Sequence, residues 1–297
     1  MSEQTIAAIE AGGTKFVAAL ADAGGTILAR ERFATRTPDA VFPELVAFFD
    51  GAARDHGPIG GIGVASFGPI GIDREAPDYG HFLNTPKPGW KGASWLDTLK
   101  PLAAPIMVDT DVNGAALGEW IAGAGRGCRT LAYTTVGTGI GTGVLHDGVP
   151  RSGISHLETG HVRPPRAAGD AFAGTCPFHG DCLEGLASGP AIKGRWGASL
   201  DQLGDVERDT VAGYLAHFAA TLVLLHMPER LIFGGGVLHA PGLLEAVRAK
   251  TEAFLAGYVD HPALDPGLAR YITLPGCGDD AGITGAIELG RRAMLQR

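Results

Sequence analysis

Two stretches of the chain share one pattern, and this repeat constrains the fold more than any other feature of the sequence. "IAAIEAGGTKFVAALADAGG", from Ile6, and "LAYTTVGTGIGTGVLHDGVP", from Leu131, align without a gap. Each has a β-prone apolar run, a Gly/Thr turn, a second apolar run and a polar turn, which together predict a β-hairpin. Small residues and hydroxyls fill both Gly/Thr turns, where a plain hairpin needs only Asn-Gly or Asp-Gly. The repeat predicts two related halves, each with a hairpin whose backbone amides face an anion.

Strands and helices alternate after each predicted hairpin. "IGGIGVASFGPIG" indicates a buried strand, and "APIMVDTDVNGAALGEWIAGAG" indicates a strand that runs directly into a helix. After the second hairpin come a loop with two cysteines, a long helix around "VAGYLAHFAATLVLLHM", the strand "RLIFGGGV" and two further helices. This alternation in two related halves predicts an α/β protein with two lobes and a cleft between them.

Composition and charge exclude several classes of function. The chain has 297 residues with 45% hydrophobic side chains, and its apolar runs are shorter than the roughly 20 residues of a membrane span. A net charge of -8, without any run of Lys or Arg, argues against a nucleic-acid surface. No basic segment precedes the first apolar run, so no secretion signal is visible. We expect a soluble, cytoplasmic protein with small-molecule partners, neither nucleic acid nor membrane.

Cysteine and histidine gather in one segment of the second half. The spacing His161-x14-Cys176-x2-His179-x2-Cys182 supplies two imidazoles and two thiolates, a set that fits tetrahedral zinc. Four protein ligands leave no coordination position for water, so such a zinc would be structural. The alternative is a surface histidine beside unlinked thiols. The carboxylates Glu158 and Glu184 bracket this cluster, whereas the other two cysteines, Cys128 and Cys277, lie apart from it.

Asp111 has two interpretations that the residues alone leave open. It directly precedes a predicted helix, where Asp is a preferred N-cap, although Gly114 stands where a capping box needs Glu or Gln. It also follows a strand at the mouth of the expected cleft, where a general base would meet a substrate hydroxyl. The turns "EAGGTK" and "TTVGTGIGTG" are similarly open between phosphate binding and a structural turn, since neither fits the Walker A or dinucleotide pattern.

Taken together, the motifs resemble the ROK family of bacterial sugar kinases and sugar-responsive repressors, and within it the zinc-containing fructokinase branch. The resemblance rests on "IEAGGTKF", "SFGPI", "NTPKPGW", "DTDVNGAALGE", "TVGTGIGTG", "ETGH", "CPFHGDCLEGLASGPAI" and "FGGGV", in that order. It implies the actin-like sugar-kinase/Hsp70 fold, with a duplicated βββαβαβα core. We expect an N-terminal lobe over residues 1–108, with a C-terminal helix at about 281–297 packed back on it. Residues 109–280 would form the second lobe, with the zinc loop and the nucleotide site.

Residue by residue, the resemblance assigns roles across the chain. Asp111 matches the catalytic base. Sugar contacts are implied for Glu158, His161 and Glu184, and zinc ligation for His161, Cys176, His179 and Cys182. ATP contacts are implied for Gly12, Gly13, Thr14, Lys15, Thr138, Pro190, Gly234, Gly235, Gly236 and Val237. Three positions depart from common family residues: Thr110 replaces the Asn of glucokinases, Thr142 replaces a glycine, and Leu157 replaces a proline.

The implied activity is ATP-dependent, Mg²⁺-assisted phosphorylation of a hexose, with fructose 6-phosphate the expected product and a homodimer the family expectation. A kinase for glucose, mannose or an N-acylhexosamine would use the same machinery. A non-catalytic sugar sensor is disfavoured because Asp111 is present. A zinc hydrolase is disfavoured because four protein ligands close the metal site.

Overall fold

The computed structural model of the chain describes residues 4–264 and 266–296. Residue contacts divide it into two compact units. Unit 1 holds the chain up to Gly123, the segment Ser152–His156 and the chain from Cys277 onward; unit 2 holds Ala124–Arg151 and Leu157–Gly276. No helix among the described residues is long and apolar enough to cross a membrane.

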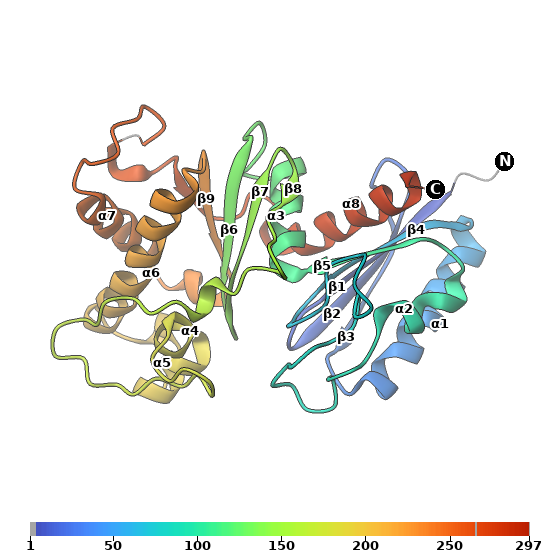
Figure 1. Cartoon of the computed structure of the whole chain (residues 1–297), viewed down its shortest axis with the longest axis horizontal. Coiled ribbons are helices and arrows are strands. Elements are labelled where there is room, and N and C mark those ends of the chain that lie inside the picture. Colours follow the sequence, from blue (N-terminus) through green and yellow to red (C-terminus); the bar gives the residue numbers. More distant parts are fainter. Residues whose placement is uncertain (1–3, 265, 297) are drawn as a thin grey trace. The chain divides into compact units, whose positions relative to one another are not determined.

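Unit 1 is built on one five-stranded sheet of order β3-β2-β1-β4-β5 (Figure 1). The first three strands are antiparallel neighbours, and β4 and β5 extend the sheet in parallel from β1. The strands are β1 (Thr5–Ala11), β2 (Lys15–Ala21), β3 (Ile27–Ala34), β4 (Ile59–Ser66) and β5 (Ile106–Thr110). The helices are α1 (Pro38–His56), α2 (Trp95–Leu99), α3 (Asp111–Ala122) and α8 (Ala281–Leu295).

Helix α1 covers one face of this sheet. Pro38 fits the first helical turn because its missing N–H has no partner there in any case. Val41, Leu45, Phe49 and Ala52 recur at helical spacing and are buried against the sheet. That spacing gives α1 one continuous apolar face, and its burial holds the helix on the sheet.

Helices α3 and α8 pack on the other face of the same sheet, close to β4 (Figure 1). The approach is very tight: a Cβ atom at Gly63 of β4 would lie 1.9 Å from the carbonyl oxygen of Ala286 in α8. Because α3 packs on α8 and β4, it belongs to unit 1, whereas the sequence expectation began the second lobe at residue 109. Of the C-terminal helix expected at 281–297, residue 297 lies outside the described residues.

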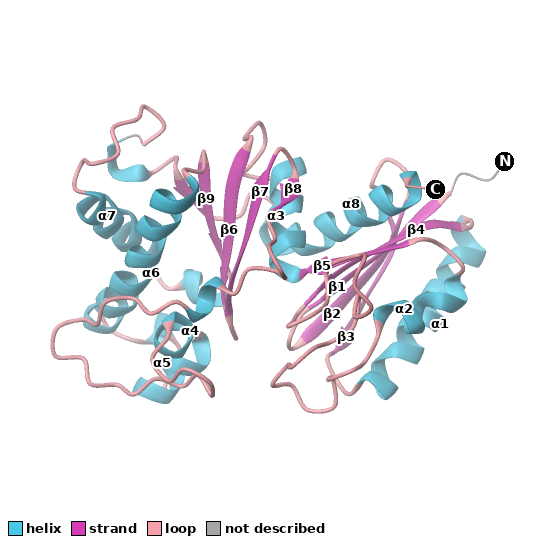
Figure 2. Cartoon of the chain, viewed as in Figure 1, coloured by secondary structure: helices cyan, strands magenta, loops and turns pink. Residues whose placement is uncertain are grey.

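Unit 2 repeats the same topology with a second five-stranded sheet, of order β10-β9-β6-β7-β8. Its strands are β6 (Thr130–Val136), β7 (Ile140–His146), β8 (Val149–Pro150), β9 (Arg230–Gly234) and β10 (Ile272–Thr273). Its helices are α4 (Leu183–Ala187), α5 (Gly189–Trp196), α6 (Asp205–His226) and α7 (Leu243–Leu255) (Figure 2). The buried faces of α6 and α7 pack with β6, β7 and β9 in one apolar core.

Short 3₁₀ helices complete the elements: η1 (Lys100–Leu102), η2 (Thr159–His161), η3 (Leu200–Gln202), η4 (Gly236–His239), η5 (Pro266–Leu268) and η6 (Gly278–Asp280). In each sheet three antiparallel strands come first, and two parallel strands follow after helices. The predicted hairpins are confirmed as β1–β2 and β6–β7. The α/β class with a duplicated βββαβαβα order is therefore also confirmed.

Candidate functional site

The turn of the first hairpin leaves backbone donors unused. Gly12 N donates to the carbonyl oxygen of Lys15 over 3.0 Å and closes the turn, and the Thr35 hydroxyl donates to the Gly12 carbonyl over 2.8 Å. Within the described chain, the amides of Gly13 and Thr14 form no hydrogen bond. Two adjacent unbonded amides are donors that an anion could accept from.

The turn of the second hairpin is the centre around which the other predicted nucleotide residues gather. Thr138 forms its tip, where Gly137 N donates to the carbonyl of Gly139 over 2.9 Å. Gly189 N, at the start of α5, donates to the Gly137 carbonyl over 2.8 Å and brings Pro190 beside the hairpin. A helix N-terminus there adds amides and a favourable dipole for phosphate.

The end of β9 also meets this hairpin. Gly235 has φ 92°, and a Cβ atom there would lie 2.4 Å from the carbonyl oxygen of Val136, so only glycine allows this approach. The run Gly234–Val237 thereby follows the backbone of the second hairpin. Unit 2 thus brings together Thr138, Pro190 and Gly234–Val237, while Gly12–Lys15 lie in unit 1.

Asp111 is the first residue of α3, and the interpretation of Asp111 as the N-cap is wrong. Thr110 is the cap, because its hydroxyl oxygen accepts from Asn113 N over 3.2 Å. Thr and Asn both cap helices, so Thr110 serves α3 at the position where glucokinases usually have Asn. The Asp111 carboxylate accepts from Val112 N over 2.8 Å and is half-buried. The residue is therefore held at the end of β5 without being the cap.

Asp109 forms hydrogen bonds with two residues at the start of α3. One oxygen of its carboxylate accepts from the side-chain amide of Asn113 and from Thr110 N, each over 2.7 Å. Burial raises the pKa of Asp109, while these two hydrogen bonds and the charges of His156 and Arg292 act in the opposite direction. Sequence reasoning missed Asn113, because Asp109 belongs to β5 and Asn113 to α3, so no helical periodicity links the two side chains.

The four predicted metal ligands come together in unit 2. One ligand atom from each of His161, Cys176, His179 and Cys182 lies within 4.8 Å of all the others. His161 Nδ1 is 3.7 Å from Cys176 Sγ and 3.5 Å from Cys182 Sγ, and His179 Nδ1 is 3.6 Å from Cys176 Sγ. Tetrahedral zinc with its usual bond lengths separates nitrogen and sulfur ligands by about 3.6 Å. The donor set and its spacing fit zinc.

The surroundings of the cluster also fit a cation. Burial raises the pKa of the Cys182 thiol to about 11, so a thiolate there needs a counter-charge. His161 turns Nδ1 toward the sulfurs, and its Nε2 lies 3.9 Å from a carboxylate oxygen of Glu158. A carboxylate behind a ligating histidine orients the ring and strengthens the ligand.

The three predicted sugar residues gather at the start of β7. Glu184 Oε2 accepts from Ile140 N over 2.9 Å. Gly160 packs so close to Ile140 that a Cβ atom at Gly160 would lie 1.8 Å from its carbonyl oxygen. Glu158 and His161 flank Gly160, so both segments that carry the sugar residues contact the strand that leaves the second hairpin. Glu184 is therefore bound to the hairpin as well as adjacent to the metal cluster.

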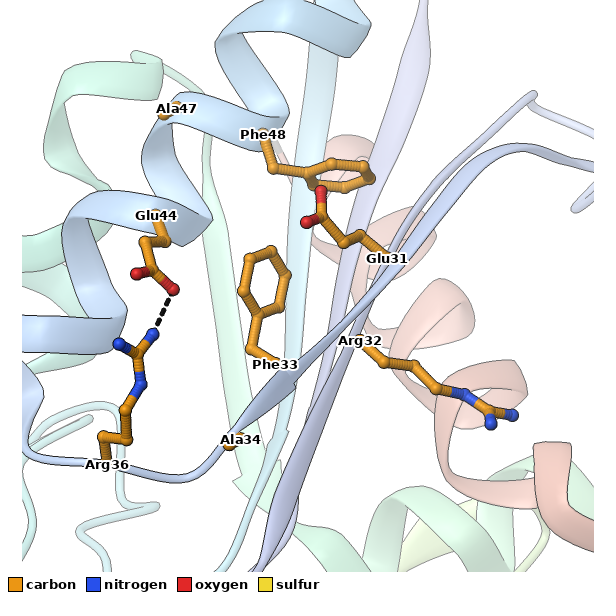
Figure 3. A pocket seen from close by; sticks show the side chains of 8 residues that line it. All are labelled: Glu31, Arg32, Phe33, Ala34, Arg36, Glu44, Ala47 and Phe48. Carbon is orange, nitrogen blue, oxygen red and sulfur yellow. Dashed lines mark hydrogen bonds and ion pairs between the residues drawn. The ribbon is translucent and has the colours of Figure 1, made fainter.

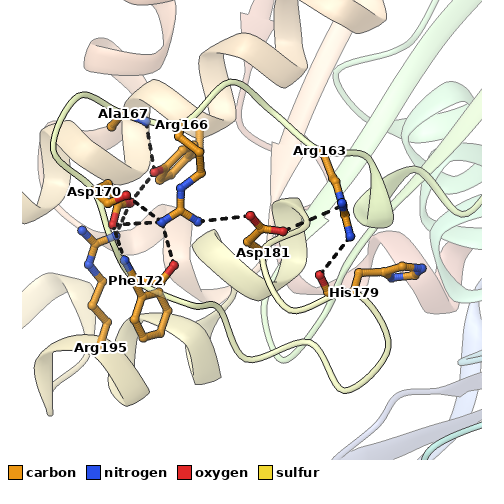
Figure 4. A network of polar contacts seen from close by, with 9 residues as sticks. Arg163, Arg166, Ala167, Asp170, Phe172, His179, Asp181 and Arg195 are labelled. Atoms are coloured by element: carbon orange, nitrogen blue, oxygen red, sulfur yellow. Dashed lines mark hydrogen bonds and ion pairs between the residues drawn. The ribbon is translucent and has the colours of Figure 1, made fainter.

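A buried ion network fixes the loop between η2 and α4 (Figure 4). The side chain of Asp170 is 3% exposed and accepts from Arg195 on α5 over 2.8 Å, from Tyr214 on α6, and from Phe172 N over 2.9 Å. Arg166 lies 3.2 Å from the same carboxylate and 3.7 Å from Asp181, next to Cys182. No sequence pattern pointed to Asp170, since two of its partners, Arg195 and Tyr214, come from distant segments.

Two further residues at the hairpins were missed. Glu10, two residues before Gly12, has a buried carboxylate oxygen Oε2 without a hydrogen-bond partner. Burial raises the pKa of Glu10, against the lowering effect of Lys15 and Arg30. In the second hairpin, the hydroxyls of Thr134 and Thr142 form a buried cross-strand hydrogen bond of 2.9 Å, which explains why threonine can replace glycine at 142.

A pocket of about 560 Å³ lies between β3 and α1 in unit 1 (Figure 3). Phe33 and Phe48 form its apolar wall, and Arg36 donates to Glu44 at its edge. None of the residues predicted from the sequence lines this pocket. The candidate groups are therefore the first hairpin and the start of α3 in unit 1, and the second hairpin and the His/Cys loop in unit 2.

The chain is similar in sequence and structure to known sugar kinases. The chain is 44% identical over 292 residues to a fructokinase of Zymomonas mobilis, with 96% of each chain covered. The ROK hexokinase of Thermus thermophilus has a similar structure, with a TM-score of 0.78 and 25% identity over 99% of this chain and 100% of that one. A ROK family glucokinase of Streptomyces griseus, solved with glucose and AMPPNP, gives a TM-score of 0.72 and 25% identity over 97% and 99%.

The duplicated sheets are those of the actin-like ATPase fold. A family model described as the ROK family matches residues 6–293, which span both hairpins, the start of α3 and the His/Cys loop. The chain is accordingly a member of the ROK family.

Proposed function

We propose that the protein is an ATP-dependent hexose kinase that converts fructose to fructose 6-phosphate. The observation that carries this proposal is the 44% identity to a fructokinase along nearly the whole chain. A glucokinase with the same fold shares only 25% identity, which supports fructose over glucose. The site residues give the proposal a mechanism.

Asp111 is proposed as the general base. It accepts the proton of the attacking hydroxyl as the oxygen of that hydroxyl bonds to the terminal phosphorus of ATP. Its position at the end of β5 suits this role, because the cap and the brace of α3 are supplied by Thr110 and Asp109 instead. The carboxylate of Asp111 is held by the backbone amide of Val112, while Thr110 supplies the cap that stabilises the helix.

The two hairpins are proposed to bind the phosphates of ATP. The unbonded amides of Gly13 and Thr14 would serve as donors in unit 1, and the turn at Thr138 beside the N-terminus of α5 would supply donors in unit 2. Bound Mg²⁺ would neutralise phosphate charge during transfer. Glu10 is the residue of the first hairpin that fits its hydrated ion, since its buried Oε2 has no other partner.

The His/Cys cluster is proposed to hold a structural zinc ion. The closed set of four protein ligands suits structure rather than catalysis. Its role would be to fix the segment Glu158–His161, so that the sugar contacts of Glu158, His161 and Glu184 keep one geometry. We also propose a cytoplasmic location, because the reaction consumes ATP and all four cysteines are free thiols. A homodimer is proposed from family membership alone.

The test is coupled ADP formation with a panel of hexoses. We expect fructose to have the highest kcat/KM by at least about tenfold, or about 1.4 kcal/mol of transition-state discrimination. Equal or faster turnover of glucose, mannose or an N-acylhexosamine would refute fructose as the preferred substrate but would still support a hexose kinase. Binding of sugar without turnover would make the protein a sensor, and hydrolysis without ATP would overturn the proposal entirely.

A further inference from the structure

Lys87 reaches the turn of the first hairpin from a separate loop. Its Nζ donates to the carbonyl oxygen of Gly13 over 2.5 Å and lies 5.8 Å from the centre of the Phe67 ring. Gly13 is one of the two turn residues with an unbonded amide. The ammonium and the anion-binding amides therefore occupy the same turn.

The loop that carries Lys87 is fixed to the hairpin by buried aromatic rings. Trp90 is fully buried and packs edge-on against Phe16, the second residue of β2, with ring centres 5.6 Å apart. The indole N–H of Trp90 donates to the carbonyl of Arg36 over 3.0 Å, and its backbone N–H donates to the carbonyl of Lys87 over 3.3 Å. These contacts hold the lysine backbone, so the position of the ammonium is prepared before any ligand binds.

The charge of Lys87 has no counter-charge in the described chain. Arg30 and Arg36 of unit 1 are paired with Asp280 and Glu44, whereas the exposed Lys15, Lys91 and Lys100, like Lys87, form no ion pair within the described residues. The ammonium has three N–H donors, and within the described residues only the neutral carbonyl of Gly13 accepts from it. A Cβ atom at Gly13 would meet nothing within 4 Å, so there is room above the turn. A half-buried, unneutralised cation beside free amides and open space is arranged for an anion.

We propose that Lys87 is a catalytic residue that binds the terminal phosphoryl group of ATP as it is transferred. This inference rests on the proposed kinase function. During transfer the bond from phosphorus to the β,γ-bridging oxygen breaks, a bond from phosphorus to the sugar oxygen forms, and the hydroxyl proton passes to Asp111. Lys87 remains protonated throughout and stabilises the negative charge on the oxygens of the moving group.

The test compares Lys87→Met, Lys87→Gln and Lys87→Arg with the control Lys91→Met. Lys91 is an exposed lysine four residues further along, so its substitution removes the same charge at a site away from the turn. Glutamine keeps a donor for the Gly13 carbonyl but carries no charge. Affinities for AMPPNP and for ADP are measured by titration calorimetry, kcat by coupled assay, and folding by thermal unfolding.

We expect Lys87→Met and Lys87→Gln to lower kcat by at least about 100-fold and to weaken AMPPNP about tenfold, with ADP affinity unchanged, because only AMPPNP carries the terminal group. Lys87→Arg should recover most of the AMPPNP affinity, and Lys91→Met should behave like the parent. An unchanged ratio of AMPPNP to ADP affinity in Lys87→Gln overturns the proposal; Lys87 would then only connect its loop to the first hairpin through the Gly13 carbonyl. A rise in fructose KM alone also overturns it.

The two proposals fail in different ways. If the parent protein phosphorylates no hexose, the kinase function fails, while the AMPPNP-to-ADP comparison still decides whether Lys87 binds a terminal phosphoryl group. If the parent is active and Lys87→Gln retains full kcat, the kinase stands and the role of Lys87 is refuted.

Discussion

The two hairpins have the same topology but opposite charges beside them. At the first turn, the ammonium of Lys87 lies on the carbonyl of Gly13. At the second, the carboxylate of Glu184 binds the amide of Ile140 at the start of β7. The repeated sheets supply two similar backbone turns, and segments outside the repeat supply the side chains that make them different. In the proposed mechanism, the first turn would bind the transferred phosphoryl group, and the second would connect the predicted nucleotide residues with the predicted sugar residues.

The segments that make this difference are also stabilised differently. The loop of Lys87 is fixed by buried aromatic rings, whereas the loop before Glu184 is fixed by the His/Cys cluster and the Asp170 network. If unit 1 supplies the chemical step and unit 2 holds the sugar, substitutions in the two units should change different measurements.

The largest effect is expected at Asp111, in unit 1. Asp111→Asn should lower kcat by a factor of about 10² to 10⁴, because an amide cannot take the hydroxyl proton. Stability should barely change, since Thr110 is the cap. The matched control is Thr110→Ala, which should cost about 1 kcal/mol of stability. The measurements are kcat and thermal unfolding; an Asp111→Asn protein with nearly full kcat would show that Asp111 is not the base, and Asp109 would be tested next.

Loss of a metal ligand should affect unit 2 first. The parent is expected to contain about one zinc per chain by elemental analysis. Cys182→Ala should lose that zinc, unfold at lower temperature and raise the KM for fructose by about 10- to 100-fold, since Glu158 and His161 lose their fixed position. Cys128→Ala, away from the cluster, should retain zinc. Unaltered zinc content and kinetics in Cys182→Ala would show that the cluster is not a metal site.

The Asp170 network gives a pH-dependent effect of intermediate size. Burial raises the pKa of Asp170, but hydrogen bonds from Tyr214, Phe172 N and Arg195 outweigh it and hold the pKa below its usual value. Asp170→Asn should cost about 1 to 2 kcal/mol of stability at neutral pH, because the partly exposed Arg166 and Arg195 lose the charge of their buried partner.

The contribution of a lowered carboxyl pKa is complete above about pH 4 and is lost as the pH falls through the lowered folded value. In urea unfolding, the parent and Asp170→Asn should therefore converge below about pH 4. A stability difference that stays constant down to pH 2 would indicate a packing effect instead of a charge effect.

The smallest effect concerns the second hairpin directly. Glu184→Gln keeps an acceptor for Ile140 N and removes the charge, so unfolding should change by less than about 0.5 kcal/mol. If Glu184 contacts the sugar as proposed, fructose KM should rise about tenfold, while ADP affinity should stay within about twofold because glutamine keeps the hydrogen bond to Ile140 N in the hairpin. Equal losses for sugar and ADP would mean that Glu184 shapes the hairpin and does not contact the sugar.

Local patterns predicted the parts of the molecule that are locally determined. Alternating apolar residues and Gly/Thr turns predicted both hairpins, and the short spacing of Cys176, His179 and Cys182 predicted that they meet. The capping box was sought at Gly114, so the cap at Thr110 was missed, although Thr is a preferred cap. Lys87 and Asp170 depend on partners distant in sequence, and no local pattern encodes such contacts.

The close packing of α8 on β4 and β1 affects the order in which a growing chain can become native. Gly63 in β4 packs against Ala286 of α8, so the face of the unit 1 sheet that α3 and α8 share is only partly covered until residues 281–295 have been synthesised. Unit 2, residues 124–151 and 157–276, is synthesised after the first part of unit 1 and before its part from residue 277 onward, and the short unit 1 segment 152–156 interrupts it. Unit 1 is therefore begun before unit 2 and completed after it. Before α8 is synthesised, the apolar surface that α8 covers in the folded unit is exposed, and such surface favours aggregation.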